Sequence, residues 1–81
     1  MAVGAQTGEL TDEAKFKLAV MQVIDRELRD RYDTMIAAAE AANVSWARLS
    51  RLRRGRHDQF SIAWLFRLAR DTGVRIRISI D

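Results

Sequence analysis

The sequence predicts a mainly α fold: four helices followed by one C-terminal β-strand that pairs with a second copy of the chain. Residues 11–73 contain four stretches of helical character, and each begins with a serine, threonine or aspartate that can cap it. Residues 74–80, VRIRISI, alternate apolar and polar side chains, as a half-buried strand does. We divide the chain accordingly into a flexible lead-in (1–10), a helical domain (11–73) and a dimerisation strand (74–81).

Size and composition favour one small domain without disulfides. The chain has 81 residues, a size at which one core contributes only a few kcal/mol, and it has no cysteine. Apolar residues make up 48% and charged residues 31%, an ordinary balance for a folded soluble chain. No apolar run approaches the roughly 18 residues of a membrane span, and no signal peptide is recognisable. We therefore expect a cytoplasmic protein that needs no metal or cofactor.

The first helix is predicted to begin after Thr11 and to reach about Arg31. A threonine hydroxyl caps a helix well, and the acids that follow it, Asp12 and Glu13, suit the positive end of the helix dipole. An apolar stripe at 3.6-residue spacing then faces the core. It consists of Phe16, Val20, Val23, Ile24 and Leu28.

The second helix is predicted at 34–42, TMIAAAEAA, where alanines favour helix and allow another helix to approach closely. Asp33 or Thr34 caps its start. The pattern breaks at Asn43, the non-glycine residue that best tolerates the left-handed conformation at a helix end. A tight turn therefore separates this helix from the next.

The third helix is predicted to be capped by Ser45 and to stop at Gly55, since glycine is favoured just past a helix end. A short polar loop at 56–59 follows. Ser61 caps the fourth helix, IAWLFRLARDT, and Gly73 ends it. Its core stripe is predicted to be Ile62, Leu65, Leu68 and Ala69.

The terminal strand raises the question of its partner. A single strand leaves its backbone hydrogen-bonding groups unsatisfied, and the chain contains no second strand pattern. The simplest partner is the same strand of a second subunit across a two-fold axis. The fourth helix is apolar more than halfway around, so part of it is free to join this interface. The expected dimer contacts are Trp64, Phe66, Val74, Ile76, Ile78 and Ile80.

Charge is divided unevenly along the chain. The net charge of +3 combines −3 over residues 1–40 with +6 over residues 41–81, and no acid occurs between Ala41 and His57. Five arginines fall within residues 46–56, WARLSRLRRGR. A merely solvated surface would be expected to mix acids with bases, so this segment points to a polyanionic partner.

A helical projection of the third helix separates two faces. Leu49 and Leu52 point together toward the core, at about 100° per residue. The opposite face combines a small residue, a hydroxyl and two guanidiniums: Ala47, Ser50, Arg51 and Arg54. Such a face suits the DNA major groove, because alanine permits close approach and arginine grips guanine through two hydrogen bonds. Trp46, Arg48 and Arg53 lie on the flanks, where Trp46 serves equally well as a DNA contact or as a cover for the core edge.

Residues 34–55, TMIAAAEAANVSWARLSRLRRG, resemble a helix-turn-helix of the Xre/Cro type, the class of lambda repressor. Ala39 stands at the small residue of the helix crossing and Asn43 at the turn, and the buried positions of the motif hold Val44, Leu49 and Leu52. The continuation through the terminal strand resembles a subgroup of HigA-type antitoxins and small phage or plasmid repressors. The resemblance covers about residues 14–80 and implies a four-helix, lambda-repressor-like domain.

The resemblance also implies which residues face DNA. Ser45, Trp46, Ala47, Ser50, Arg51 and Arg54 would meet the duplex, with Thr34 near its backbone. Met35 departs from the family, which usually has a phosphate-binding glutamine at that position. Arg48, Arg53 or Arg56 would then compensate for the missing contact.

The sequence therefore predicts a dimeric, sequence-specific DNA-binding regulator that represses its own promoter from a pseudopalindromic site. The alternative is an antitoxin or other protein-interaction module, whose acidic first half would meet a basic toxin. A basic helix bound to a membrane or to a calmodulin-like receptor is a weaker third interpretation, because the apolar face is needed in the core. We expect no enzymatic activity, since the single histidine, His57, has no supporting nucleophile or acid constellation.

Overall fold

The computed structural model describes residues 10–77. Its elements are α2 (Asp12–Arg31), α3 (Met35–Ala42), α4 (Trp46–Arg53), the 3-10 helix η1 (His57–Gln59) and α5 (Ile62–Thr72). The four predicted α-helices are confirmed, while the segment expected to be a polar loop contains the short turn η1. Most of the predicted lead-in (1–9) and the end of the expected strand (78–81) lie outside the described residues.

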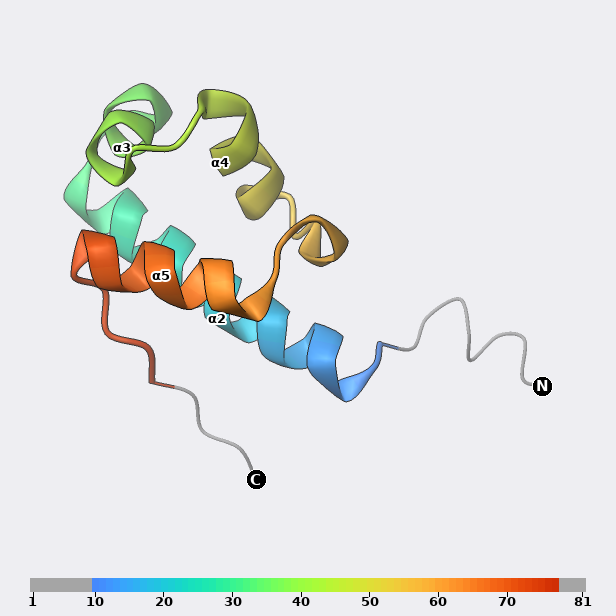
Figure 1. Ribbon diagram of the computed structural model, residues 1–81. Helices are drawn as coiled ribbons and strands as arrows, with labels where there is room; N and C mark the ends of the chain where they lie inside the picture. Colours follow the sequence, from blue (N-terminus) through green and yellow to red (C-terminus); the bar gives the residue numbers. More distant parts are fainter. Residues whose placement is uncertain (1–9, 78–81) are drawn as a thin grey trace.

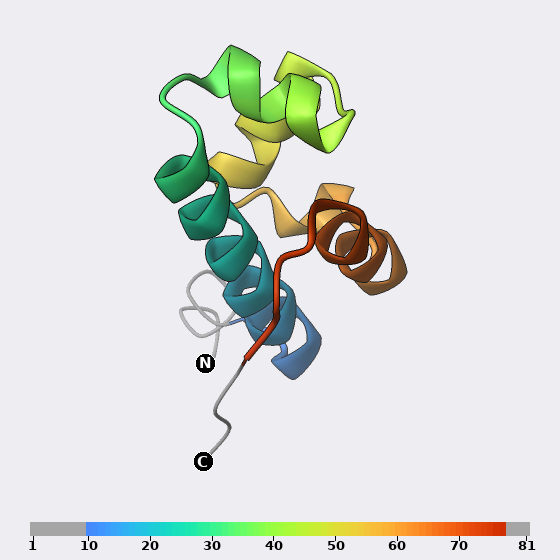
Figure 2. The same cartoon turned by 90° about the vertical axis from the view of Figure 1, so that its left-hand side faces the viewer.

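The long helix α2 is the base on which the other elements pack. It contacts α3, α4, η1 and α5. Figure 1 shows α5 crossing α2 with α3 and α4 on one side of this pair, and Figure 2 shows α5 nearly end-on beside α2. Because α2 touches every other described element, its apolar stripe forms the centre of the core.

The core is a single cluster with members from every α-helix. Val20, Ile24 and Leu28 of the predicted α2 stripe are buried, whereas Phe16 and Val23 are half-buried at its margin. Small residues line α3, so that this helix lies close to its neighbours. The remaining buried members are Met21, Ala38, Ala39, Ala42, Leu49, Leu52, Phe60, Leu65, Leu68, Ala69 and Val74, and Ala14 is buried outside this cluster.

Each α-helix begins at the hydroxyl residue that the sequence predicts. The side-chain oxygens of Thr11, Thr34, Ser45 and Ser61 each accept a hydrogen bond from the backbone N–H three residues later, at 3.0–3.1 Å. This bond satisfies one of the N–H groups that a helix leaves free at its start. Between the two candidates for the second helix, the structure therefore selects Thr34 over Asp33.

Three helices end in the same way, with one residue in the left-handed conformation. Asn43, Gly55 and Gly73 have φ values of +59°, +76° and +73°. The backbone N–H groups at and just after each of these residues turn back to helix carbonyls, for example Val44 N to Ala39 O at 3.0 Å. The predicted roles of all three residues are confirmed.

Residues 74–77 form no strand within the single chain. No other element between residues 10 and 77 is extended, so nothing in that part of the chain offers a ladder of backbone hydrogen bonds. Val74 instead turns into the core, where only 6% of it is exposed. The strand and its pairing therefore stay a prediction, and residues 78–80 of it lie beyond the described part.

Candidate nucleic-acid interface

Helices α3 and α4 are joined by a turn of three residues, 43–45. Asn43 closes α3 in the left-handed conformation, Val44 is half-buried against the core, and Ser45 opens α4 by capping the N–H of Arg48 at 3.1 Å. Each turn residue thus has a separate role. Two short helices joined in this way, with the second carrying the basic face, match the helix-turn-helix arrangement predicted from the sequence.

The core fixes which side of α4 faces outward. Leu49 is 1% exposed and Leu52 is 3% exposed, so both are held against α2 and α3. The opposite side of the helix carries Ala47, Arg51 and Arg54, which are exposed, and Ser50, which is half-buried. The orientation predicted by the helical projection is confirmed, and contact of these side chains with DNA stays a prediction.

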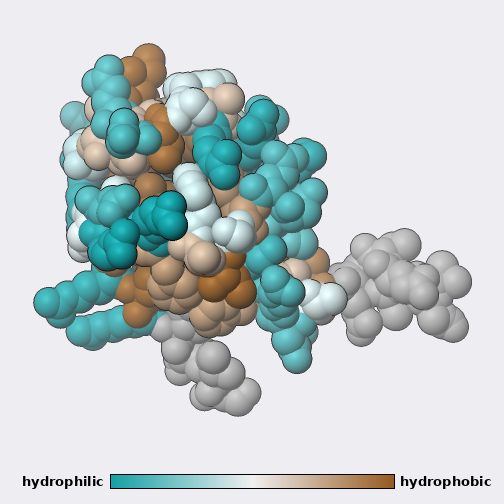
Figure 3. Space-filling view, in the orientation of Figure 1, coloured by the Kyte–Doolittle hydropathy of each residue, from teal (hydrophilic) through white to brown (hydrophobic). Residues whose placement is uncertain are grey.

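The outward face of α4 has the chemistry of an anion-binding surface. Between residues 10 and 77 neither Arg51 nor Arg54 lies within ion-pair distance of an acid. Arg56, which follows α4 and precedes η1, is exposed as well. Figure 3 shows hydrophilic side chains along the side of the molecule where α4 and η1 lie. Three guanidiniums are therefore presented to solvent together.

Exposed apolar side chains stand at the starts of both helices of the motif. Trp46, in the first turn of α4, is 54% exposed, so it does not simply cover the core edge. Ile36, in the first turn of α3, is 63% exposed and was not among the predicted site residues. Thr34 is exposed beside it and caps α3. The apolar ring of Trp46, at the start of α4, suits contact with a thymine methyl group.

Arg53, for which the sequence predicts a DNA contact, is bound to α2. Its Nε donates to Asp25 Oδ1 at 2.9 Å, and the other carboxylate oxygen of Asp25 lies 3.1 Å from Arg29 Nε. The side chains of Arg53 and Asp25 are only 19% and 17% exposed. Asp25 is not predictable as a partner from the sequence, because no local pattern links residues 28 positions apart.

Arg48 is also turned inward, against the aromatic rings of Phe60, which follows η1, and of Trp64 in α5. Its guanidinium carbon lies 4.4 Å from the ring centre of Trp64 and 5.4 Å from that of Phe60. The two rings are themselves 5.1 Å apart. The Nε of Arg48 is buried and has no hydrogen-bond partner among residues 10–77. A guanidinium stacked on aromatic faces is attracted by their negative π-surfaces.

The residues predicted for the dimer interface differ in how far they are exposed. Phe66 is 41% exposed and its ring centre lies 6.1 Å from that of Phe16 of α2. Trp64 is half-buried against Arg48 and Phe60, and Ile76 is half-buried against the core. Val74 belongs to the core of its own chain, so it is not available to a partner in this arrangement. Ile78 and Ile80 lie outside the described residues.

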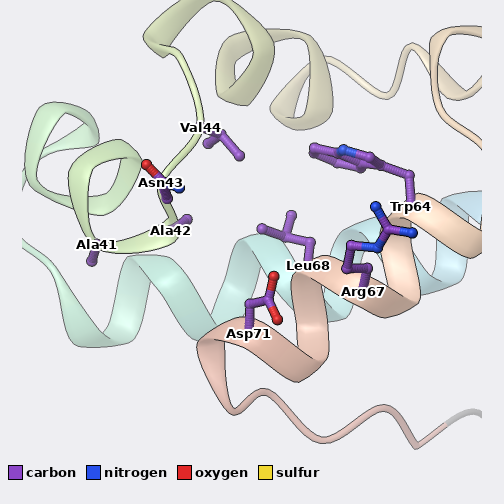
Figure 4. Close-up of a pocket in the computed structure, with 8 residues that line it drawn as sticks. All are labelled: Ala41, Ala42, Asn43, Val44, Trp64, Arg67, Leu68 and Asp71. Carbon is purple, nitrogen blue, oxygen red and sulfur yellow. The ribbon is translucent and has the colours of Figure 1, made fainter.

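A groove lies between the turn of the motif and α5 (Figure 4). It has a volume of about 440 Å³ and is open to solvent. Val44, Trp64 and Leu68 line its apolar part, and Asn43, Arg67 and Asp71 add polar groups. Trp64 thus contacts Arg48 and also forms one wall of this groove.

Comparisons with known proteins agree with this geometry. A family model described as "Helix-turn-helix domain" matches residues 7–81. A search of curated proteins gave no match, and neither did a search of solved structures. Among the described residues, no helix is both long enough and apolar enough to cross a membrane. Because the family model covers nearly the whole chain, the chain belongs to a family of helix-turn-helix domains.

Proposed function

We propose that this protein is a sequence-specific DNA-binding regulator that reads the major groove with α4. The observation that carries the proposal is the outward face of α4, where Ala47, Ser50, Arg51 and Arg54 stand opposite the buried leucines. In helix-turn-helix proteins the second helix lies in the major groove while the first crosses the backbone. Here α4 and α3 take these positions.

The proposed contacts have two kinds of role. Arg51 and Ser50, in the middle of the face, are placed to read base edges, because arginine bonds guanine through two acceptors. Arg54, Arg56 and the start of α3 at Thr34 are placed to bind phosphates, which supply affinity and its salt dependence. Trp46 adds an apolar contact at the start of α4.

We also propose that two copies bind together on a pseudopalindromic site. Phe66 of α5 is exposed beside the half-buried Phe16 of α2, and Figure 3 shows hydrophobic area over α5. The alternating residues that follow Val74 would pair across the two-fold axis through their backbone. Two recognition helices would then meet half-sites about one helical turn, roughly 34 Å, apart. Occupation of its own promoter in this way would repress transcription.

The antitoxin interpretation has less support from the described residues. It depends on carboxylates of the first half being free for a basic toxin. In α2, however, Asp25 pairs with Arg29 and Arg53, and Glu27 lies 3.3 Å from Arg31. Asp30 and Asp33 are exposed and have no ion-pair partner among residues 10–77, so only part of the acidic charge remains available to a basic toxin. We therefore place the DNA-binding regulator first.

Selection of bound duplexes from a random pool, at a low and a moderate salt concentration, tests the proposal. We expect enrichment of a pseudopalindrome at both concentrations, with weaker total binding at the higher one. Retention of all sequences equally would remove sequence specificity from the proposal. No retention even at low salt would remove DNA binding altogether and favour a protein partner.

A further inference from the structure

The five arginines of residues 46–56 fall into two structural groups. Arg51, Arg54 and Arg56 are exposed, whereas Arg48 and Arg53 are half-buried and engaged with other elements. We propose that Arg48 and Arg53 are positioning residues that hold the recognition helix from its two flanks, leaving only the exposed three to bind DNA. This inference rests on the proposed function and assigns different roles to residues that look alike in the sequence.

Arg48 and Arg53, called here the two inward arginines, lie symmetrically on either side of the buried face of α4. At about 100° per residue, Arg48 and Arg53 lie about 70° to either side of the midline between Leu49 and Leu52. One side chain reaches toward α5 and the other toward α2. Leucine contacts alone would allow α4 to rotate about its own axis, because dispersion contacts are not directional. The contacts of Arg48 and Arg53, one on each flank, oppose this rotation.

On the first flank, Arg48 is held by aromatic rings and not by an acid. Trp64 lies 4.4 Å and Phe60 5.4 Å from its guanidinium carbon, and its Nε is buried. A guanidinium in this position is stacked and partly shielded from water, so it cannot reach a phosphate without leaving both rings. The contact joins the first turn of α4 to the first turn of α5.

On the second flank, Arg53 is held by a carboxylate. The 2.9 Å bond to Asp25 joins the last turn of α4 to the middle of α2, and Arg29 on the same carboxylate fixes the orientation of Asp25 at 3.1 Å. With both side chains under 20% exposed, this pair is shielded from salt better than an ordinary surface pair. Because Arg29 shares this carboxylate, the three side chains keep a net charge of +1, but the guanidinium of Arg53 is already bound to Asp25 before any DNA arrives.

The salt dependence of DNA binding distinguishes the two groups. Removing one phosphate contact reduces the steepness of log affinity against log salt by about 0.9. We compare Arg48→Met and Arg53→Met with Arg54→Met and Arg56→Met, which remove the same charge and keep a similar side-chain length. The first two should leave the slope unchanged while reducing the ratio of affinities for the selected site and a mismatched site. The second two should make the slope shallower.

A slope that becomes shallower by the same amount in Arg48→Met or Arg53→Met as in the controls would overturn the proposal. If neither Arg54→Met nor Arg56→Met changes the slope, the proposed DNA interface is wrong. The role of Arg48 and Arg53 is then tested by a measurement on the protein without DNA. This separation keeps the two proposals distinguishable.

The measurement in free protein is the NMR spectrum of the unmodified chain. Because Arg48 stacks on Trp64, its side-chain protons should resonate upfield through ring currents, and Trp64→Leu should abolish the shift. The Nε–H groups of Arg48 and Arg53 should exchange with solvent more slowly than those of Arg51, Arg54 and Arg56. Fast exchange and unshifted resonances for both inward arginines would contradict the proposal, whether or not DNA binds.

Discussion

Helices α4 and α5 bury the same kind of side chain but expose different ones. Leu49 and Leu52 anchor α4 in the core as Leu65 and Leu68 anchor α5. On the free side, α4 presents arginines around an alanine, whereas α5 presents Phe66 beside Phe16 of α2. The buried faces alone would not separate a DNA-binding helix from a protein-binding one. The function of each helix therefore depends on the side chains that the fold does not need.

The exposed arginines of α4 and α5 also differ in their ion pairing. Arg70 of α5 lies 3.6 Å from its neighbour Asp71, so its charge is partly offset. Within the part of the chain that the structure describes, Arg51 and Arg54 of α4 have no acid within ion-pair distance. On α5, Arg67 is likewise exposed without an ion-pair partner among those residues, but it lies at the groove beside Trp64 and Leu68. The pair of guanidiniums on α4 is available to phosphate or guanine, while Phe66 gives α5 an apolar surface for a partner.

The largest expected effect tests whether both helices are equally anchored. Leu49→Ala and Leu65→Ala should each lower the free energy of unfolding by about 2–5 kcal/mol, because each removes buried methyl groups and leaves a cavity. Urea unfolding measures both. Leu10, which is 40% exposed, provides a matched control, and Leu10→Ala should cost far less. A Leu49→Ala variant as stable as the control would show that α4 is not part of the core.

The next effect tests the outward face of α4. Arg51→Ala should weaken binding to the selected DNA site by about 1–3 kcal/mol and relax the preference at one base pair. Unfolding should change by no more than about 0.5 kcal/mol, since Arg51 is exposed. Arg70→Ala, on α5, is the control and should leave DNA affinity nearly unchanged. If Arg51→Ala weakens binding to all sequences equally, Arg51 binds the phosphate backbone and reads no base.

A smaller effect tests the apolar face of α5. Phe66→Ala should weaken self-association by about 1–2 kcal/mol, roughly tenfold in the dissociation constant, because an exposed aromatic is a typical interface anchor. Sedimentation at several concentrations measures this change. Trp46→Ala removes an exposed aromatic from α4 instead and should leave self-association alone. If both variants dissociate to the same extent, or if the unmodified chain is monomeric, α5 is not the dimer surface.

The smallest effect separates two helix caps that look alike. Ser45→Ala and Ser61→Ala each remove a capping bond, to the N–H of Arg48 and of Trp64, and should each cost about 1 kcal/mol of stability. Ser45 also lies at the proposed DNA surface, so Ser45→Ala should reduce DNA affinity as well. Equal DNA affinities for the two variants at a temperature where both are folded would remove Ser45 from the interface.

Local rules of the sequence predict most of the fold. The caps at Thr11, Ser45 and Ser61, and the left-handed ends at Asn43 and Gly73, depend only on residues three to five positions away. The two faces of α4 follow from a regular helical period that tertiary packing does not disturb. Such features can be predicted because the physical cause and its effect lie within one or two turns of chain.

The same rules do not predict what the flanks of α4 contact. Arg48 and Arg53 resemble the exposed arginines in the sequence, because a helical projection shows an angle and not a neighbour. The partners Trp64 and Asp25 lie 16 and 28 residues away, on helices whose positions only the folded core determines. The 3-10 turn η1 escapes prediction for a related reason, since a short polar segment carries no periodic signal.

Titration of the isotopically labelled chain with a duplex carrying the selected site tests the central claim most directly. If α4 reads the major groove, backbone amide shifts should concentrate at residues 45–56 and at the start of α3 near Thr34, while α5 around Phe66 stays unchanged. Shifts concentrated on α5, or none at a salt concentration low enough to favour phosphate contacts, would contradict the account.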